Sequence, residues 1–439
     1  MSRTKFDLTN FVFQVGKIGK LQTMDVIPVI AGDSISLDFS AIVRLAPLRR
    51  SLTLDAIVDL FAFYVPHRHA YAGDGDHNAW FKFIRDGQRP DATNTLPSRT
   101  LPADYFCLGA PKLSGVVPRW RVNPYNQIYN RYFKHPTDQD KDIFHANFVG
   151  PNGLKTRQFG LSCCYDKTFW TTCQAYDGRY KDRVEASETY KQTVSGNEAT
   201  IDIWAREEAV AQYNNQSQRM FFDIRYNDVL QRTWGGHANI DADQRPSLLS
   251  RNRTYLSGYD VDGTSEGSLG QFGGKAFANA TLRLPRIACP EHGTVWVMCL
   301  IRFPTIHESE LHYLESPNQV SANYAQMAAD PRIVASRKPQ KIKSSDLFVD
   351  GTAVDLGVQP FGQWYRHHPN RVHSLFAKLN GFPFLDKLPI SVTDAHYYDS
   401  DEADAVFQSP NQLGHYTVQA RQNIMAYRVY PQSSSGLFV

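Results

Sequence analysis

Two histidines, His67 and His69, are the residues whose types and spacing most directly suggest chemistry. They follow the apolar run IVDLFAFYV (57–65) and Pro66, with one residue between them. In an extended chain, residues two apart point to the same side, so both imidazoles would face one space. Paired imidazoles are common metal ligands. The competing interpretation is a structural corner where a buried strand ends.

The metal interpretation needs partners that the sequence does not supply nearby. The HxH pair is similar to that of cupins, jelly-roll enzymes that bind a metal inside the barrel. Such a site also needs a carboxylate soon afterwards and a third histidine on a later strand. The first acidic residue after the pair is Asp74, and the later histidines include His292, His367 and His368. We therefore expect the two histidines to form hydrogen bonds with loop carbonyls. A jelly-roll metal-binding (cupin-like) protein that uses His67 and His69 is the alternative. The sequence does not identify the metal ligands.

Other short motifs lack the context that their chemistry requires. Gly263–Gly267 matches G-x-S-x-G, but SLGQFGG follows it where a nucleophile elbow would continue as a helix. Asp260–Gly263 resembles the start of a calcium loop without the later ligands, so we expect a tight turn and leave calcium binding open. No CxxC, P-loop or G-x-G-x-x-G occurs. The sequence predicts no catalytic residue, no enzyme and no cofactor, with calcium as a candidate ion.

Two segments are candidates for contact with nucleic acid. The run RKPQKIK (337–343) contains Arg337, Lys338, Lys341 and Lys343, whose charges could bind phosphates. The run YNQIYNRYF (125–133) could stack unpaired bases on Tyr129 beside Arg131, although packing against a core would explain these aromatics equally well. The chain has 47 Lys and Arg against 44 Asp and Glu. Because the charges nearly balance, any contact with nucleic acid must be made by a local patch or be assisted by a separate cationic partner.

The elements that would position these residues are mainly strands. Residues 34–45, SISLDFSAIVRL, alternate apolar and polar side chains, which predicts a half-buried strand. The strand that begins at Ile57 follows within hairpin distance. Two further strands are expected at 295–301 and 416–430. We expect the core strands mostly within 20–70, 285–305 and 415–431. Residues 71–284 would be largely insertion loops, with a helix near 203–230 that Gly235 and Gly236 end.

Composition indicates a folded protein and excludes several other classes. Of its 439 residues, 42% are hydrophobic and 21% are charged, which is unlike a disordered chain. The N-terminal residues do not resemble a secretory signal, and no apolar run approaches the length of a membrane span, so we expect no membrane insertion. The six cysteines are then expected to be reduced. A single domain over 1–439 is the simplest organisation, with a carbohydrate-binding module as a further reading.

Several segments, in order along the chain, together resemble the major capsid proteins of microviruses, the small tailless icosahedral phages with circular single-stranded DNA. The likeness is closest to the phi-X type. The matching segments are IPVIAGDS (27–34), LAPLRR (45–50), FYVPHRH (63–69), IYNRYFK (128–134), SGYDVDGTSEGSLGQFGG (257–274), PEHGT (290–294), RFP (302–304), GQWYR (362–366), GFPF (381–384) and FQS (407–409).

The resemblance implies an eight-stranded antiparallel jelly-roll barrel with long loop insertions that carry a few helices. It implies a structural protein of the virion that assembles with itself into an icosahedral shell around single-stranded DNA, in the cytoplasm of a bacterial host. Implied partners are a spike protein, a small basic DNA-packaging protein, and internal and external scaffolding proteins. Residues 72–79, 136–199, 337–343 and the C-terminal tail depart from the family pattern, so surface functions located there do not carry over.

Overall fold

The computed structural model describes a β-rich core and parts of the segments around it. The described residues are 3–19, 21–48, 55–70, 80, 81, 84, 93–95, 116–133, 158–162, 170–173, 226–237, 245–262, 272–303, 312, 315, 340–343, 345, 355–359, 368, 407 and 414–429.

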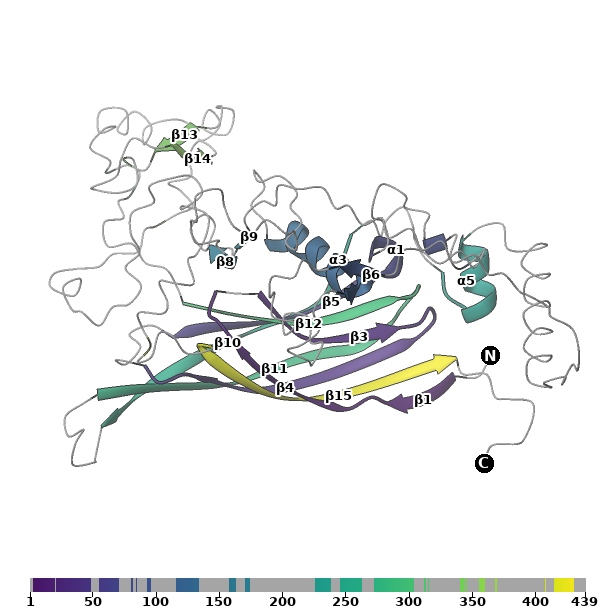
Figure 1. The fold of residues 1–439 in the computed structure, drawn as a ribbon, viewed down its shortest axis with the longest axis horizontal. Helices are drawn as coiled ribbons and strands as arrows, with labels where there is room; N and C mark the ends of the chain where they lie inside the picture. The colour runs from purple at the N-terminus through teal and green to yellow at the C-terminus, as the bar shows by residue number, and fades with distance from the viewer. Residues whose placement is uncertain are drawn as a thin grey trace, which may run out of the picture.

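One curled antiparallel sheet dominates these residues (Figure 1). Its strands are β1 (Arg3–Asp7), β2 (Asn10–Gly16), β3 (Leu21–Val29), β4 (Ser34–Leu45), β5 (Ala56–Pro66), β10 (Ser247–Asp262), β11 (Phe272–Ala288), β12 (Gly293–Arg302) and β15 (Tyr416–Val429). They are ordered β1-β15-β4-β11-β10-β5-β12-β3, and β2 also pairs with β15. The sheet bends at β10 and β11, so its two halves face each other across the core.

The strand pairs are nested from the ends of the sequence inward. β2 pairs with β15, β3 with β12, β4 with β11, and β5 with β10. This succession of pairs is what results when one long hairpin is wound into a barrel, which is the jelly-roll arrangement. The predicted fold class is therefore confirmed.

Side-chain patterning explains why particular strands lie where they do. In β4 the residues at odd positions, Ile35 to Leu45, are buried, while most even positions face outward, as the alternation predicted. β5 and β12 are buried at every position. Their second face is covered by a helical segment, since Phe61 and Phe63 contact the rings of Phe133 and Tyr132.

Side chains, in place of a backbone ladder, connect the two edges of the curled sheet. The Tyr416 hydroxyl donates to Gln22 Oε1 at 2.9 Å, and Gln22 Nε2 donates to the Val15 carbonyl at 3.3 Å. Further along, Asn10 Nδ2 and Gln422 Nε2 both donate to Asp25 Oδ2. These bonds link β2 and β15 to β3. The barrel is thus closed by polar contacts from Gln22 and Asp25.

Shorter elements lie outside this sheet. The helices are α1 (His67–Ala70), α3 (Arg119–Ile128), the π-helical turn η3 (Tyr129–Phe133) and α5 (Tyr226–Trp234). Three small two-stranded sheets pair β6 (Thr93–Thr95) with β7 (Val116–Pro118), β8 (Gln158–Ser162) with β9 (Trp170–Cys173), and β13 (Gln340–Lys343) with β14 (Asp355–Gln359). In Figure 1, α1 and α3 lie above β5 and β12, and β13 and β14 lie apart from the main sheet.

The structure adds two features of the core that the sequence did not predict. The sheet includes β10 and β11, which lie wholly or mainly within the 71–284 range that was expected to be largely loops. β5 is also not the neighbour of β4, because β11 and β10 lie between them. A short connection suggested adjacency, but the nested winding pairs each strand with a partner distant in sequence.

The helix expected near 203–230 falls partly outside the described residues. Residues 203–225 are among those the structure does not describe, and α5 begins at Tyr226. The predicted stop is confirmed. Gly235 has a φ of 71°, a left-handed conformation that favours glycine, and its N–H donates to the Gln231 carbonyl at 3.0 Å.

Two substitutions on β4 would test the assignment of its faces. Leu37→Ala opens a cavity in the core and should lower the free energy of unfolding by roughly 2–5 kcal/mol. Ile42→Ala, on the outer face, should cost less than about 1 kcal/mol. Urea unfolding of the dissociated protein measures both. Equal losses would mean that β4 is not half-buried.

Candidate functional site

The histidine pair lies in a helical turn and not in an extended segment. His67 and His69 belong to α1, where residues two apart point about 200° away from each other around the helix axis. The expectation that both imidazoles face one side is therefore wrong. The His67 ring packs 4.9 Å from Trp80, and the carbonyl of His69 accepts a bond from Gln127 Nε2 at 2.7 Å.

A metal site receives no support from this geometry. Across the described part of the chain, no group of three or more His, Cys, Asp or Glu is placed to hold a metal ion. Of the other histidines considered, His292 lies near α1, and its carbonyl accepts a bond from the His67 N–H at 2.8 Å. His367 lies outside the described residues. These contacts agree with the interpretation of the pair as a structural corner.

Glu291 is the main polar anchor of this corner. Its carboxylate is fully buried and accepts from Arg68 Nε, at 3.0 Å to each oxygen. The hydroxyl of Tyr226, at the start of α5, donates to the same carboxylate, and the Tyr64 hydroxyl donates to the Glu291 backbone carbonyl at 2.7 Å. Burial and the Glu291 charge raise the pKa of Tyr226 above its ordinary value, so the phenol stays protonated. Glu291 therefore ties α1 and α5 to β5.

Two half-buried histidines, His67 and His292, lie beside this anchor. Burial lowers the pKa of His67 to about 4, with a further contribution from the nearby His292. Burial also lowers the pKa of His292 to about 4. The His292 ring lies 4.3 Å from the ring of Trp234 at the end of α5. The corner thus packs two neutral imidazoles among indole rings.

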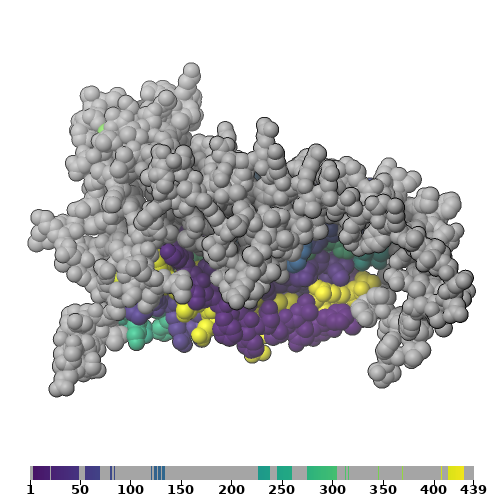
Figure 2. Space-filling view, viewed as in Figure 1, coloured from purple at the N-terminus to yellow at the C-terminus, as the bar shows by residue number. Residues whose placement is uncertain are grey.

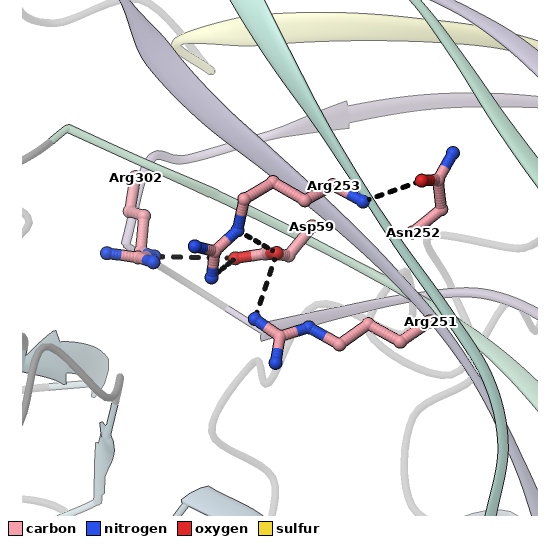
Figure 3. Close-up of polar contacts among 5 residues, drawn as sticks. All are labelled: Asp59, Arg251, Asn252, Arg253 and Arg302. Atoms are coloured by element: carbon pink, nitrogen blue, oxygen red, sulfur yellow. Dashed lines mark hydrogen bonds and ion pairs between the residues drawn. The ribbon is translucent and has the colours of Figure 1, made fainter.

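A second charged cluster lies in the middle of β5, the strand that is buried at every position (Figure 3). Asp59 is fully buried, and three guanidinium groups converge on its carboxylate. Arg253 Nε lies at 2.8 Å, Arg251 Nη2 at 3.2 Å and Arg302 Nε at 3.5 Å. The arginines come from β10 and β12, the two neighbours of β5. One buried carboxylate thus binds three guanidinium groups from the two neighbouring strands.

Sequence reasoning missed both anchors, although one signal was present. An aspartate inside the run IVDLFAFYV had to be buried, and a buried carboxylate needs cationic partners. The partners could not be named, because Arg251, Arg253 and Arg302 lie far away in the sequence. Only the strand order shows that β10 and β12 flank β5.

The residues predicted to contact nucleic acid are not assembled into one described site. Tyr129 is 1% exposed within η3, so its ring packs in the core and is not available to stack a base. Arg131 is exposed. Lys341 and Lys343 belong to β13, whereas Arg337 and Lys338 lie outside the described residues.

The remaining sequence motifs are placed only in part. Asp260, Val261 and Asp262 continue β10 and pair with β11, so the tight turn expected from Asp260 onward does not begin there. Gly263 and the following residues are outside the described part, and calcium binding stays a prediction. No helix among the described residues is long and apolar enough to cross a membrane.

The Asp59 cluster makes a direct prediction about stability. Asp59→Asn would remove the buried carboxylate that three guanidinium groups share and should cost roughly 3–5 kcal/mol. The matched control is Asp38→Asn, which removes an exposed ion pair with Arg283 and should cost less than about 1 kcal/mol. Urea unfolding of both variants tests this. A small loss for Asp59→Asn would show that the cluster is not a structural anchor.

The two histidines make a prediction about pH. The pKa of each histidine is about 4 in the folded protein, below the ordinary 6.5. Between pH 4 and pH 6.5 the unfolded chain therefore binds more protons than the folded protein. Stability should be fully present above pH 6.5 and fall as the pH drops toward 4, by up to about 3 kcal/mol for each histidine. A series of urea titrations over this range measures it. His292→Gln should show a shallower loss, and an unchanged slope would contradict the assignment.

Comparison with known proteins identifies the family. The family model described as Capsid protein (F protein) matches residues 1–179 and 187–437. The Capsid protein F of Escherichia phage G4 is 34% identical, over 99% of this chain and 97% of the relative. The Capsid protein F of Enterobacteria phage phiK is 36% identical over 97% and 95%, and that of Escherichia phage alpha3 is 35% identical over the same shares.

These matches agree with the resemblance carried by the ordered sequence motifs and with the jelly-roll winding of the strands. They give no support to the metal-binding alternative. The chain belongs to the Capsid protein (F protein) family of microviruses and is a structural major capsid protein.

Proposed function

We propose that copies of this chain assemble into a closed T=1 icosahedral shell that encloses circular single-stranded DNA. The proposal rests on the match to phage capsid proteins over nearly the full length of the chain. The two faces of the barrel also differ. One half of the sheet is covered by α1, α3 and η3, whereas the outer face of the other half is exposed. A shell subunit needs this kind of rigid wall with unlike sides.

The charge balance supports a shell that works with additional proteins. With 47 cationic against 44 acidic residues, the chain alone supplies little net charge for neutralising a packaged genome. We infer that a small basic packaging protein supplies the rest. Spike and scaffolding proteins complete the proposed set of partners, and assembly takes place in the cytoplasm of the bacterial host. No step of this function requires catalysis.

The exposed Arg131 and the basic segment 337–343 remain candidate contacts to DNA. Their proposed role is to bind phosphates through charge, which is independent of base sequence.

Assembly is the property to test first. The purified full-length chain should sediment as pentamer-sized or larger species, and electron microscopy should show closed particles when its phage partners are co-expressed. Large buried interfaces between copies provide the driving force. Dilution at constant ionic strength distinguishes specific assembly from aggregation. A chain that stays monomeric under all conditions would contradict the proposal.

A further inference from the structure

A second, small hydrophobic core lies outside the barrel, at the corner built on Glu291. Its buried residues are Ala31, Trp80, Ile84, Tyr226, Val229 and Leu230. Most of them come from α5 and from residues 80–84, and Ala31 belongs to the turn between β3 and β4. Figure 1 shows α5 at one end of the barrel. Because the barrel has its own separate core, the packing of α5 can be lost without loss of the barrel.

The C-terminal end of α5 lies directly against the barrel. A Cβ atom on Gly32, in the turn between β3 and β4, would collide with the Trp234 carbonyl. A Cβ atom on Gly236 would collide with the Pro290 carbonyl. The ring of His292, two residues after Pro290, packs edge-on against Trp234 with 4.3 Å between the ring centroids. His292 is thus part of the surface on which α5 rests.

The side chain of His292 also holds the turn between β3 and β4. Its Nδ1 atom accepts a hydrogen bond from the Ala31 N–H at 3.4 Å. A ring nitrogen that accepts a hydrogen bond carries no proton, so this contact requires a neutral imidazole. Protonation of Nδ1 would turn the acceptor into a donor that faces the Ala31 N–H. The bond would then be lost, and Ala31 is a member of the small core against which α5 packs.

His67 places a second imidazole in the same corner. Its backbone N–H donates to the His292 carbonyl at 2.8 Å, and its ring lies 4.9 Å from the ring of Trp80. Burial lowers the pKa of both imidazoles to about 4, and the proximity of His292 contributes to the lowered pKa of His67. Each imidazole is therefore neutral while the corner is packed, and each binds a proton more readily once the corner opens.

The charged groups described around the two imidazoles favour opening in acid. Arg68, next to His67, is paired with Glu291, and the Glu291 carboxylate also accepts from Tyr226 of α5. The other titratable groups described near the corner are Tyr64 of β5, Cys289 at the end of β11, Asp33 with its partner Arg428, and the exposed Asp228 and Arg232 of α5. Since Arg68 already balances the Glu291 charge, a proton on either imidazole adds positive charge to the corner.

We propose that this corner is a pH-sensitive switch, in which protonation of His67 and His292 releases α5 while the barrel stays folded. Released α5 unwinds, because a helix of nine residues is too short to be stable in water without packing. The strands of the barrel keep their pairing, including the N-terminal and C-terminal strands that form the lower side of the molecule in purple and yellow (Figure 2). The inference rests on the contacts of the corner and is independent of the proposed function.

Amide hydrogen exchange of the full-length chain, measured by mass spectrometry at pH 7 and pH 5 and corrected for the intrinsic effect of pH on exchange, tests the proposal. The opening equilibrium of α5 should rise between these two pH values by roughly 20-fold for each histidine that binds a proton on opening. At both pH values β4 should exchange more slowly than α5, because exchange of β4 requires the barrel to unfold.

Variants at the two histidines isolate their contribution. His292→Asn keeps an acceptor for the Ala31 N–H but cannot be protonated, and His67→Phe keeps a ring beside Trp80. Each should reduce the effect of pH on α5 opening by roughly 20-fold, and the double variant should remove most of it. His237→Gln, at an exposed histidine just after α5, is the matched control and should keep the full effect. Only the change with pH is compared, so a corner that is less stable at pH 7 does not obscure the result.

Three results would overturn the proposal. The first is an opening equilibrium of α5 that is the same at pH 7 and pH 5. The second is an unreduced effect of pH in the double variant, which would assign the change to other groups. The third is equal opening of α5 and β4, which would mean that the histidines act on the whole barrel and not on the corner. The assay does not depend on assembly, so a chain that fails to form particles would count against the proposed function alone.

Discussion

Burial of strand β5 on both faces is the constraint on which the rest of the structure depends. A strand that is apolar on both sides needs a core beneath it and a cover above it. The facing half of the barrel supplies the core, and η3 supplies the cover through the contacts of its Tyr132 and Phe133 with Phe63 and Phe61. The insertion after β5 is therefore part of the fold, because removing it would expose one face of the central strand.

Charge reinforces this constraint at two points. Asp59 in β5 can be buried only because β10 and β12 bring arginines to it from both sides. Glu291 does the same for the corner, where Arg68 and Tyr226 hold α1 and α5 against the sheet. In each case a buried carboxylate joins segments that are distant in sequence.

The two halves of the barrel consequently have different surfaces. The half formed by β5 and β12 is covered, and apart from the Asp59 cluster its outward residues are mainly apolar. The other half keeps the polar and apolar alternation of β4 and β15, with arginines and aromatic rings facing outward. A structural shell protein needs this asymmetry, since its subunits must present unlike chemistry to the two sides of a closed wall.

The sequence by itself determined the local character of the core strands and the family. Alternation in 34–45 and the continuous apolar runs at 57–65 and 295–301 depend on side chains within one strand, so they can be read without knowing any partner. The same holds for the glycine stop at Gly235. The histidine pair shows the limit of such reading, because its meaning depended on whether the backbone after Pro66 is extended or helical.

Only the tertiary structure decided which strands are neighbours, that β10 and β11 belong to the sheet, and that three arginines meet Asp59. Strand pairing is a contact between distant segments, and no periodicity within a segment records its partner.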